Sequence, residues 1–268
     1  MVLARGLGTR MRAADSAVDL TPEQHRAADA GLKAMLPVRG RPFMDYILSG
    51  LADAGLTEIA IVVAPEHEAL HHYYVSEAPP SRIALSFVVQ KDPLGTADAV
   101  LAAERWTSGA DFLVMNGDNL YPARGIADLI GIDEPGLLAF DPEDLIRSGN
   151  IPADRIKRFA LIERDERGYL THIVEKPAAD RPRDSGREKP QSLVSMNCWR
   201  FDARIFDACR EVPRSSRGEL ELPEAVELAV RRGVPFKVLN ARGPVLDLSR
   251  RADAAAVERL LHGVVPRP

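Results

Sequence analysis

The chain has 268 residues, which is enough for one large α/β domain or two small ones. Its 35 basic and 39 acidic residues are interspersed, and the net charge of −4 argues against a nucleic-acid-binding protein. No apolar run approaches the roughly 20 residues that span a bilayer, and no signal peptide is recognisable. Cys198 and Cys209 are too few for a disulfide framework or a zinc site, so we expect buried thiols in a cytoplasmic protein that binds no membrane.

Short apolar runs alternate with helical patterns in the first half of the chain. Strands are expected at 1–4, 57–64, 83–90 and 111–118, and helices at 41–55, 65–77 and 95–106. This alternation predicts a Rossmann-like three-layer α/β fold with a mostly parallel mixed central sheet. Ligands of such sheets bind outside the carboxyl ends of the strands.

The pattern changes after residue 157. Residues 158–177 are typical of two antiparallel strands joined at a turn, which would form a small antiparallel β extension. Residues 178–192 are rich in Pro, Arg and Ser and are expected to be a loop. The remaining elements are a strand at 193–201, helices at 203–211 and 220–232, a strand at 235–241 and a closing helix at 249–263.

A glycine-rich turn, "LARGLGTRMR", follows the first strand. It is neither the dinucleotide fingerprint nor a GxxxxGK[ST] phosphate loop, and alone it is compatible with a tight turn that binds nothing. The alternative is a phosphate site, because glycines let backbone N–H groups approach a phosphate chain and Thr9 and Arg10 can add donors. We expect Arg12 to be a surface charge.

An apparent insertion, residues 13–31, follows this turn. Thr21 and Pro22 predict the cap and the first position of a helix. The segment could be a surface helix or a lid near the site.

Further motifs follow in order along the chain: "KAMLPVRGRPF", "QKDPLGTADAV", "VMNGDNLY", "VEKP", "NCWRF", "GELELPEA" and "VLDLS". Together with the glycine-rich turn, this series resembles the sugar-phosphate nucleotidyltransferases, in particular the glucose-1-phosphate thymidylyltransferases and uridylyltransferases. The resemblance covers nearly the whole chain. It implies one domain, 1–268, with a nucleotide-binding half (1–125) and a sugar-phosphate-binding half (126–268).

The resemblance also implies the reaction and its residues. A sugar 1-phosphate would attack the α-phosphate of an NTP in line, assisted by Mg²⁺, and pyrophosphate would leave. The implied residues are Arg10, Lys33 and Lys176 for catalysis; Ala4, Gly6, Gly8, Thr9, Gln90, Gly95 and Thr96 for the nucleotide; Glu175, Asn197 and Ala160 for the sugar phosphate; and Asp118 and Asp247 for the metal. The other reading of Asp118 is a turn cap, and that of Asp247 is a cap of the closing helix.

The base is expected to be read by Gln90, whose carboxamide offers one acceptor and two donors. This pattern suits uracil or thymine and favours UTP or dTTP, although adenine can also pair with glutamine. We assign no role to Asn116 and Asn119.

Two departures from the family pattern leave alternatives open. Arg10 and Lys33 are 23 positions apart, about twice the usual separation, and Ala160 stands where relatives have a glycine in the sugar pocket. The acceptor could therefore be a cyclitol or pseudo-sugar phosphate, phosphocholine or a phosphonate, with CTP or GTP. A non-catalytic nucleotide-sugar-binding regulator is an alternative of another class, and the chain could form a homo-oligomer.

Overall fold

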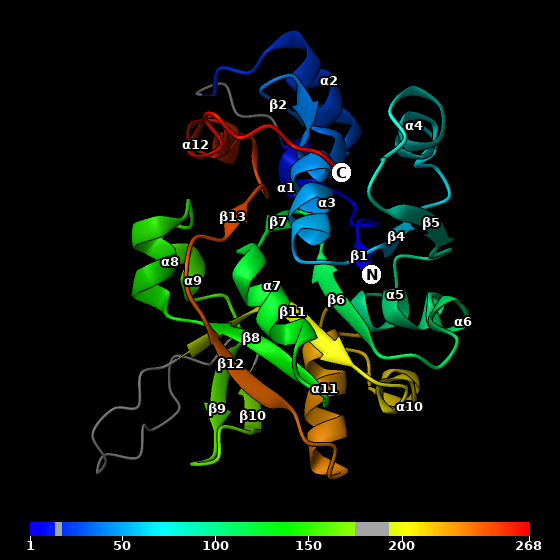
Figure 1. Cartoon of the computed structure of the whole chain (residues 1–268), viewed down its shortest axis with the longest axis vertical. Helices are drawn as coiled ribbons and strands as arrows, with labels where there is room; N and C mark the ends of the chain where they lie inside the picture. The colour runs from blue at the N-terminus through cyan, green and yellow to red at the C-terminus, as the bar shows by residue number, and fades with distance from the viewer. Residues whose placement is uncertain (14–17, 175–192) are drawn as a thin grey trace.

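The computed structural model describes residues 1–13, 18–174 and 193–268 and shows a mixed α/β fold (Figure 1). A nine-stranded sheet forms its centre. Along its main path the strands follow the order β10 (Leu170–Val174), β9 (Leu161–Arg164), β11 (Leu193–Phe201), β6 (Phe112–Asn116), β1 (Val2–Leu3), β4 (Glu58–Val63) and β5 (Ala84–Val89). Off this path, β8 (Gly136–Phe140) pairs with β11 and with β12 (Lys237–Ala241).

The strand directions confirm the expected mixed sheet. β1 is parallel to both β4 and β6, β4 is parallel to β5, and β8 is parallel to β12. β11 runs antiparallel to β6, β8 and β9, and β9 and β10 form the predicted antiparallel hairpin. The parallel strands β5, β4, β1 and β6 therefore end at the same edge of the sheet.

Both faces of the sheet are covered, as a parallel sheet requires. Ile59, Ile61 and Leu113 belong to one buried cluster, whereas Val62 and Val114 belong to a second cluster on the opposite face. The helices that contribute to the first cluster are α3 (Phe43–Asp53), α7 (Ala123–Ile130) and α12 (Ala254–Leu260). Those of the second are α5 (Thr96–Ala102), α10 (Arg204–Glu211) and α11 (Leu222–Arg231). This is the predicted three-layer arrangement.

Shorter elements complete the described chain. The helices are α1 (Thr9–Arg12), α2 (Pro22–Ala30), η1 (Lys33–Met35), α4 (Glu68–His72), η2 (Tyr73–Glu77), α6 (Glu104–Thr107), α8 (Pro142–Ser148), α9 (Ala153–Ile156) and η3 (Arg251–Asp253). The strands are β2 (Pro37–Val38), β3 (Arg41–Pro42), β7 (Asn119–Leu120) and β13 (Leu246–Asp247). None of the helices in the described ranges is long and apolar enough to cross a membrane.

The sequence patterns located every element they predicted in the described ranges, and both cysteines are buried free thiols as expected. The expected loop at 178–192 lies outside the described residues. The patterns assigned nothing between 119 and 157, where the structure has α7, α8, α9 and the central strand β8. β8 is only five residues long, and a short apolar run does not distinguish a buried strand from a helix segment.

The insertion contains the predicted helix. Thr21 caps α2 because its hydroxyl accepts a hydrogen bond from the Gln24 amide, and the Gln24 side-chain Oε1 accepts one from the Thr21 amide. Arg12 is exposed, as expected, and its Nη2 donates to the Ala30 carbonyl at the end of α2. This bond ties α1 to α2.

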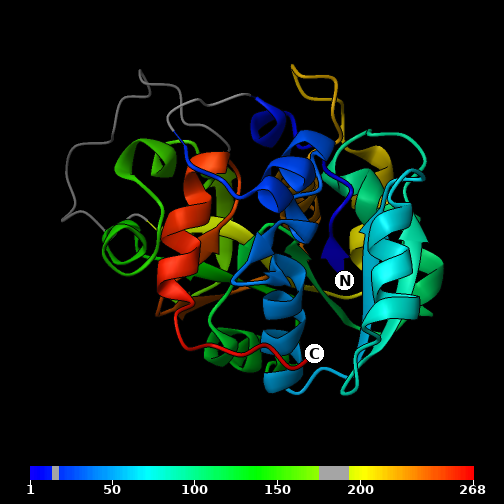
Figure 2. The same ribbon diagram turned by 90° about the horizontal axis from the view of Figure 1, so that it is seen from above.

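Arg251 fixes the insertion to the C-terminal part of the fold. Its buried guanidinium donates to the Met11 carbonyl at 2.9 Å and the Ala13 carbonyl at 3.1 Å, and it pairs with Asp29 at 2.5 Å. The C-terminal residues also return to α3, where the Arg267 amide donates to the Ser49 hydroxyl (Figure 2). The described part of the insertion is therefore anchored.

Replacing Arg251 by methionine should destabilise the protein by ~3 kcal/mol, because several backbone acceptors lose their donor together. We expect the thermal midpoint to fall by about 6–12 °C for a chain of this size, measured by differential scanning calorimetry. Arg259→Met, an exposed arginine of α12, is the matched control. Equal midpoints for the two variants would contradict the anchoring role.

Candidate active site

A cavity of about 520 Å³ lies at the edge of the sheet where the parallel strands end. Its walls include the glycine-rich turn after β1, the segment 31–34 after α2, the starts of α4 and α5, the ends of β5 and β6, part of β11 and the segment that leads into α11. Among the predicted site residues, those lining it are Ala4, Gly6, Gly8, Thr9, Arg10, Lys33, Gln90, Gly95, Thr96, Asp118 and Asn197. The structure thus gathers residues that are up to 193 positions apart in the chain.

The glycine-rich turn meets the end of the insertion directly. Gly8 has φ +64°, and a Cβ there would collide with the Gly31 carbonyl oxygen. Gly31 itself has φ +72° and caps α2. Because the two glycine backbones touch, η1 begins beside the glycine turn, and Lys33 and Arg10 line the same cavity despite their separation in sequence. Arg10 is exposed and makes no hydrogen bond or ion pair with the described residues.

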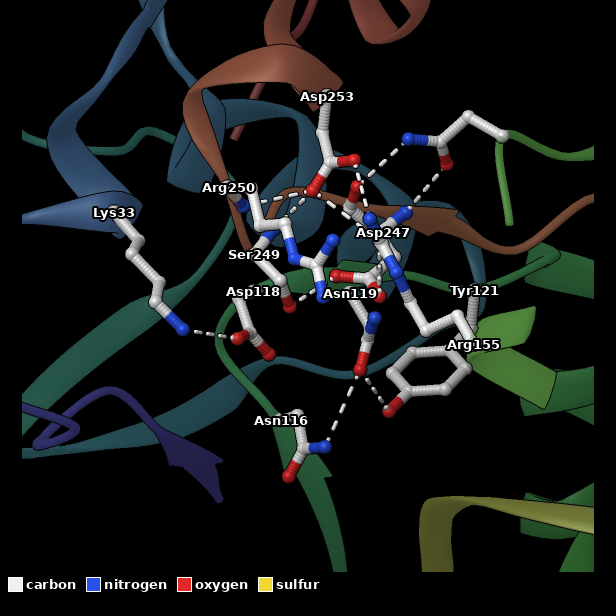
Figure 3. A network of polar contacts seen from close by, with 11 residues as sticks. Lys33, Asn116, Asp118, Asn119, Tyr121, Arg155, Asp247, Ser249, Arg250 and Asp253 are labelled. Carbon is white, nitrogen blue, oxygen red and sulfur yellow. Dashed lines mark hydrogen bonds and ion pairs between the residues drawn. The ribbon is translucent and has the colours of Figure 1, made fainter. Parts of the chain in front are cut away.

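Lys33 forms an ion pair with Asp118, with 2.8 Å between Nζ and Oδ2 (Figure 3). Asp118 follows β6 at the carboxyl edge of the sheet, as predicted. Burial acts to raise the pKa of the Asp118 carboxyl, but the charges of Lys33 and Arg10 outweigh it and the pKa is lowered. Asp118 is therefore a carboxylate at neutral pH, in a pocket whose cations balance it.

Asp247 lies on the strand next to Asp118. It belongs to β13, where it pairs with Asn119 of β7. Its side chain is 5% exposed, Oδ2 accepts from Arg155 at 2.9 Å, and Oδ1 accepts from the Ser249 hydroxyl (Figure 3). Burial raises the pKa of Asp247, and the nearby Asp118 carboxylate raises it further. Asp253, rather than Asp247, accepts the backbone amides of Ser249 and Arg250, so Asp247 is not the helix cap.

These two carboxylates fit a hard divalent cation. Mg²⁺ commonly takes one or two carboxylates and completes its shell with water and substrate phosphates, and carboxylate oxygens have lone pairs beyond those used by Arg155 and Ser249. Within the described ranges there is no group of three or more His, Cys, Asp or Glu side chains that could hold a metal unaided. Any cation here would therefore need substrate oxygens as further ligands. Asp247 is absent from the cavity lining, so it would approach the cation from the protein side of the site.

The carboxamide of Gln90 is held more firmly than the sequence suggests. Its Nε2 donates to the Gly95 carbonyl at 3.1 Å and to Asp98 at 2.7 Å. Both partners are acceptors, so the nitrogen must face them and Oε1 is the atom left for a ligand. Gln90 thus offers an acceptor alone, instead of the donor and acceptor pair expected.

Three other nucleotide-site residues have structural tasks as well. Gly95 has φ +119°, and a Cβ there would lie 2.5 Å from the Leu220 carbonyl oxygen. Glycine is therefore required at this position by the neighbouring protein backbone itself. Thr96 accepts the Leu222 amide at the start of α11. The amide of Ala4 is used in the sheet, where it donates to the Val62 carbonyl.

Asn197 has a backbone conformation that is rare for a residue other than glycine. Its φ is +58°, and it lies at an irregularity of β11 between Ser195 and Trp199. The buried Tyr121 hydroxyl donates to the adjacent Met196 carbonyl at 2.6 Å and holds this irregularity in place. Asparagine tolerates the left-handed region better than most residues, and such strain concentrates at functional sites.

Ala160 lies elsewhere. It is buried among the second core cluster, it is absent from the cavity lining, and its carbonyl accepts the Ser195 amide. Its role in the sugar-phosphate site stays a prediction. Glu175 and Lys176 lie outside the described residues.

Several cavity residues escaped the sequence analysis. Arg5 and His67 line the cavity, and so do Arg217 and Glu221, which form an ion pair at 2.5 Å. The position of Arg5, a charge between an apolar strand and a glycine turn, was a usable signal. Nothing in the local sequence distinguishes His67, because the fold alone brings it to the site.

The comparison with protein families identifies the class. The nucleotidyl transferase family model matches residues 1–244 of this chain. The chain belongs to the nucleotidyl transferase family, and it is an enzyme of that kind.

Individual relatives support this membership. The chain is 28% identical over 263 residues to the UTP–glucose-1-phosphate uridylyltransferase AglF of Haloferax volcanii, covering 97% of this chain and 95% of that one. It is 28% identical over 276 residues to a glucose-1-phosphate thymidylyltransferase of Streptomyces antibioticus, covering 100% of this chain and 67% of the relative. A solved UDP-glucose pyrophosphorylase in complex with UDP-glucose has the same fold, with a TM-score of 0.73, 17% identity and 97% coverage of both chains.

We expect His67 to titrate below the ordinary histidine value of 6.5, because burial lowers its pKa. The charge of Glu66 opposes this shift, and the charges of Arg5 and Arg12 add to it. The unfolded chain then binds the proton more readily, so this residue makes stability fall as the pH drops below about 6.5. The measurement is an NMR titration of the histidine Cε1–H signals, assigned with His67→Gln. A midpoint at or above 6.5 would contradict the prediction.

Proposed function

We propose that this protein joins a nucleoside monophosphate from UTP or dTTP to a sugar 1-phosphate and releases pyrophosphate. The observation that carries the proposal is the Lys33–Asp118 ion pair, which lies in a cavity with Arg10 and the glycine-rich turn. Cations, a carboxylate and approachable backbone amides are the groups that phosphoryl chemistry requires. The relatives named above, which carry uridylyltransferase and thymidylyltransferase names, support the same substrates.

The proposed reaction needs positioning and charge neutralisation more than proton transfer. The sugar phosphate oxygen forms a bond to the α-phosphorus as the bond to the β-phosphate oxygen breaks, and pyrophosphate leaves with the electron pair. Gly6, Gly8 and Thr9 would bind the triphosphate through backbone and hydroxyl donors, and Arg10 would neutralise the leaving pyrophosphate. Lys33 would reduce the repulsion between the two phosphate groups as they approach.

Asp118 and Asp247 would hold Mg²⁺. When bound, the cation would neutralise phosphate charge and orient the α-phosphate. Asp118 is suited to this part because its carboxyl is ionised at neutral pH and lines the cavity. The Lys33 ammonium would then be released from Asp118 toward the phosphates.

The nucleotide base would contact Gln90. Its free Oε1 can accept the N3–H of uracil or thymine, and the names of the relatives favour UTP or dTTP. We also propose that Gly95 and Thr96 form the backbone wall beside the base, and that Ala4 supplies a main-chain contact through its carbonyl.

A sugar 1-phosphate is the acceptor we favour. Asn197 lines the cavity, and we propose that it binds the sugar together with Glu175, while Lys176 binds the sugar's phosphate. Ala160 stays proposed for the sugar-phosphate site, and a cyclitol or pseudo-sugar phosphate, phosphocholine or a phosphonate stays the alternative acceptor. A panel of NTPs and phosphorylated acceptors, assayed by pyrophosphate release, tests the proposed reaction and its substrates. We also propose that the protein is cytoplasmic.

Asp118→Asn should lower kcat for pyrophosphate release by at least ~100-fold, the effect expected when one group that organises transition-state charge is removed. The matched control is Asp128→Asn, an exposed aspartate of α7 paired with Arg124, which should keep activity within about twofold. If Asp118→Asn retained near-normal turnover in Mg²⁺, the assigned role of Asp118 would be wrong.

Asn197→Gly and Asn197→Ala form a second matched pair. Both lose the carboxamide, so both should raise KM for the sugar phosphate more than KM for the NTP. Only the alanine variant keeps a Cβ in the left-handed region, so it should be less stable than the glycine variant by ~1 kcal/mol. Thermal midpoints and steady-state kinetics check both parts, and equal midpoints would contradict the strain argument.

A further inference from the structure

Arg5 is the most unusual charge in the described cavity. It is 7% exposed and lines the cavity wall directly after β1. Its Nη2 makes one long hydrogen bond, 3.4 Å, to the Lys91 carbonyl. Its Nε and Nη1 are buried and have no hydrogen-bond partner in the described part of the chain, and no carboxylate there forms an ion pair with it.

The buried Arg5 guanidinium lowers the stability of the protein when no ligand is bound. A buried guanidinium pays the desolvation cost of its charge and of each unsatisfied N–H group. An apolar side chain of similar volume, such as methionine, would avoid this cost and fill the same space. The hydrogen bond to Lys91 is too long to offset it. An acceptor supplied by a ligand would satisfy the two idle donors.

The direction of the Arg5 side chain indicates which part of a bound nucleotide it would contact. In the sheet order, β1 lies between β4 and β6, and β5 lies beyond β4. Arg5 reaches from β1 across β4 to Lys91, which follows Gln90 in the loop after β5. Asp118, the partner of Lys33, follows β6 on the other side of β1. Arg5 therefore belongs to the Gln90 end of the cavity and is separate from the phosphate end.

The two side chains at this end offer complementary groups. Gln90 can only accept, because Gly95 and Asp98 take both of its donors. Arg5 can only donate. Uracil and thymine carry an N–H group directly beside carbonyl oxygens, so an acceptor and a donor placed together can bind both at once.

We propose that Arg5 is a base-binding residue, donating from its guanidinium to a carbonyl oxygen of uracil or thymine while Gln90 Oε1 accepts the N3–H. This inference rests on the proposed function, since it takes UTP or dTTP as the nucleotide. It adds a specificity-determining side chain that the sequence motifs left unassigned.

The test is isothermal titration calorimetry of the full-length protein with UTP and with ribose 5-triphosphate, which is UTP without its base. Arg5→Met should weaken UTP binding about 10- to 100-fold, the loss expected for hydrogen bonds from a charged donor. The affinity for ribose 5-triphosphate should stay unchanged. Arg5→Lys should show an intermediate loss with UTP, because an ammonium keeps the charge without the planar fork. Arg105→Met, an exposed arginine of α6, controls for the lost charge and should bind both probes like the wild type.

A thermal midpoint measured without ligand separates a binding role from a structural one. Because Arg5→Met removes an unpaired buried charge, its midpoint should equal or exceed that of the wild type. A lower midpoint accompanied by equal losses for both probes would show that Arg5 is structural and would overturn the proposal. Loss of ribose 5-triphosphate binding at an undiminished midpoint would make Arg5 a phosphate contact, which also overturns it. Unchanged UTP affinity in Arg5→Met would overturn this inference alone, whereas a wild-type protein that bound neither UTP nor dTTP would overturn the proposed function as well.

Discussion

The site depends on one electrostatic contact, the ion pair between Lys33 and Asp118. Lys33 follows the inserted helix α2, and Asp118 follows the central strand β6. The ion pair therefore joins the insertion to the central sheet. The contact exists because Gly8 and Gly31 bring their backbones together, which cancels the effect of the insertion on the cavity. Arg251 then holds the insertion from the far side, through α1 and Asp29.

The same contact explains why the charges of the site are arranged in two layers. Lys33 and Arg10 keep Asp118 ionised at the cavity wall, and Arg155 neutralises Asp247 beneath it. Burial is the main cause of the raised pKa of Asp247, and repulsion from the Asp118 carboxylate raises it further. Arg155 also pairs with Asp253, whose other contacts start η3. The lower layer is therefore built into the fold, and the upper layer is left open for ligands.

Alternating apolar runs predicted the sheet strands other than β8, because such runs are local properties of the chain. The order of motifs, through the family resemblance, supplied eleven of the residues that line the cavity. Distant contacts were not visible in the sequence. β8 was missed because five apolar residues carry no period, and the motif position of Ala160 did not indicate that this residue is buried in the second core cluster. The engagement of Gln90 by Asp98 depends on how α5 packs against the end of β5, which no spacing rule gives.

For Arg5 and Gln90, the hydrogen bonds made within the protein say more about a ligand than the residue types do. A motif names a residue type, and a residue type lists every donor and acceptor that it could use. The fold then removes some of these: both donors of Gln90 are consumed, and two donors of Arg5 are left buried without acceptors. What remains is one acceptor, Gln90 Oε1, and the idle donors of Arg5, on two residues that line the same cavity. Since buried polar groups are nearly always satisfied in folded proteins, the groups left over describe the chemistry of the ligand more directly than the residues that line the wall.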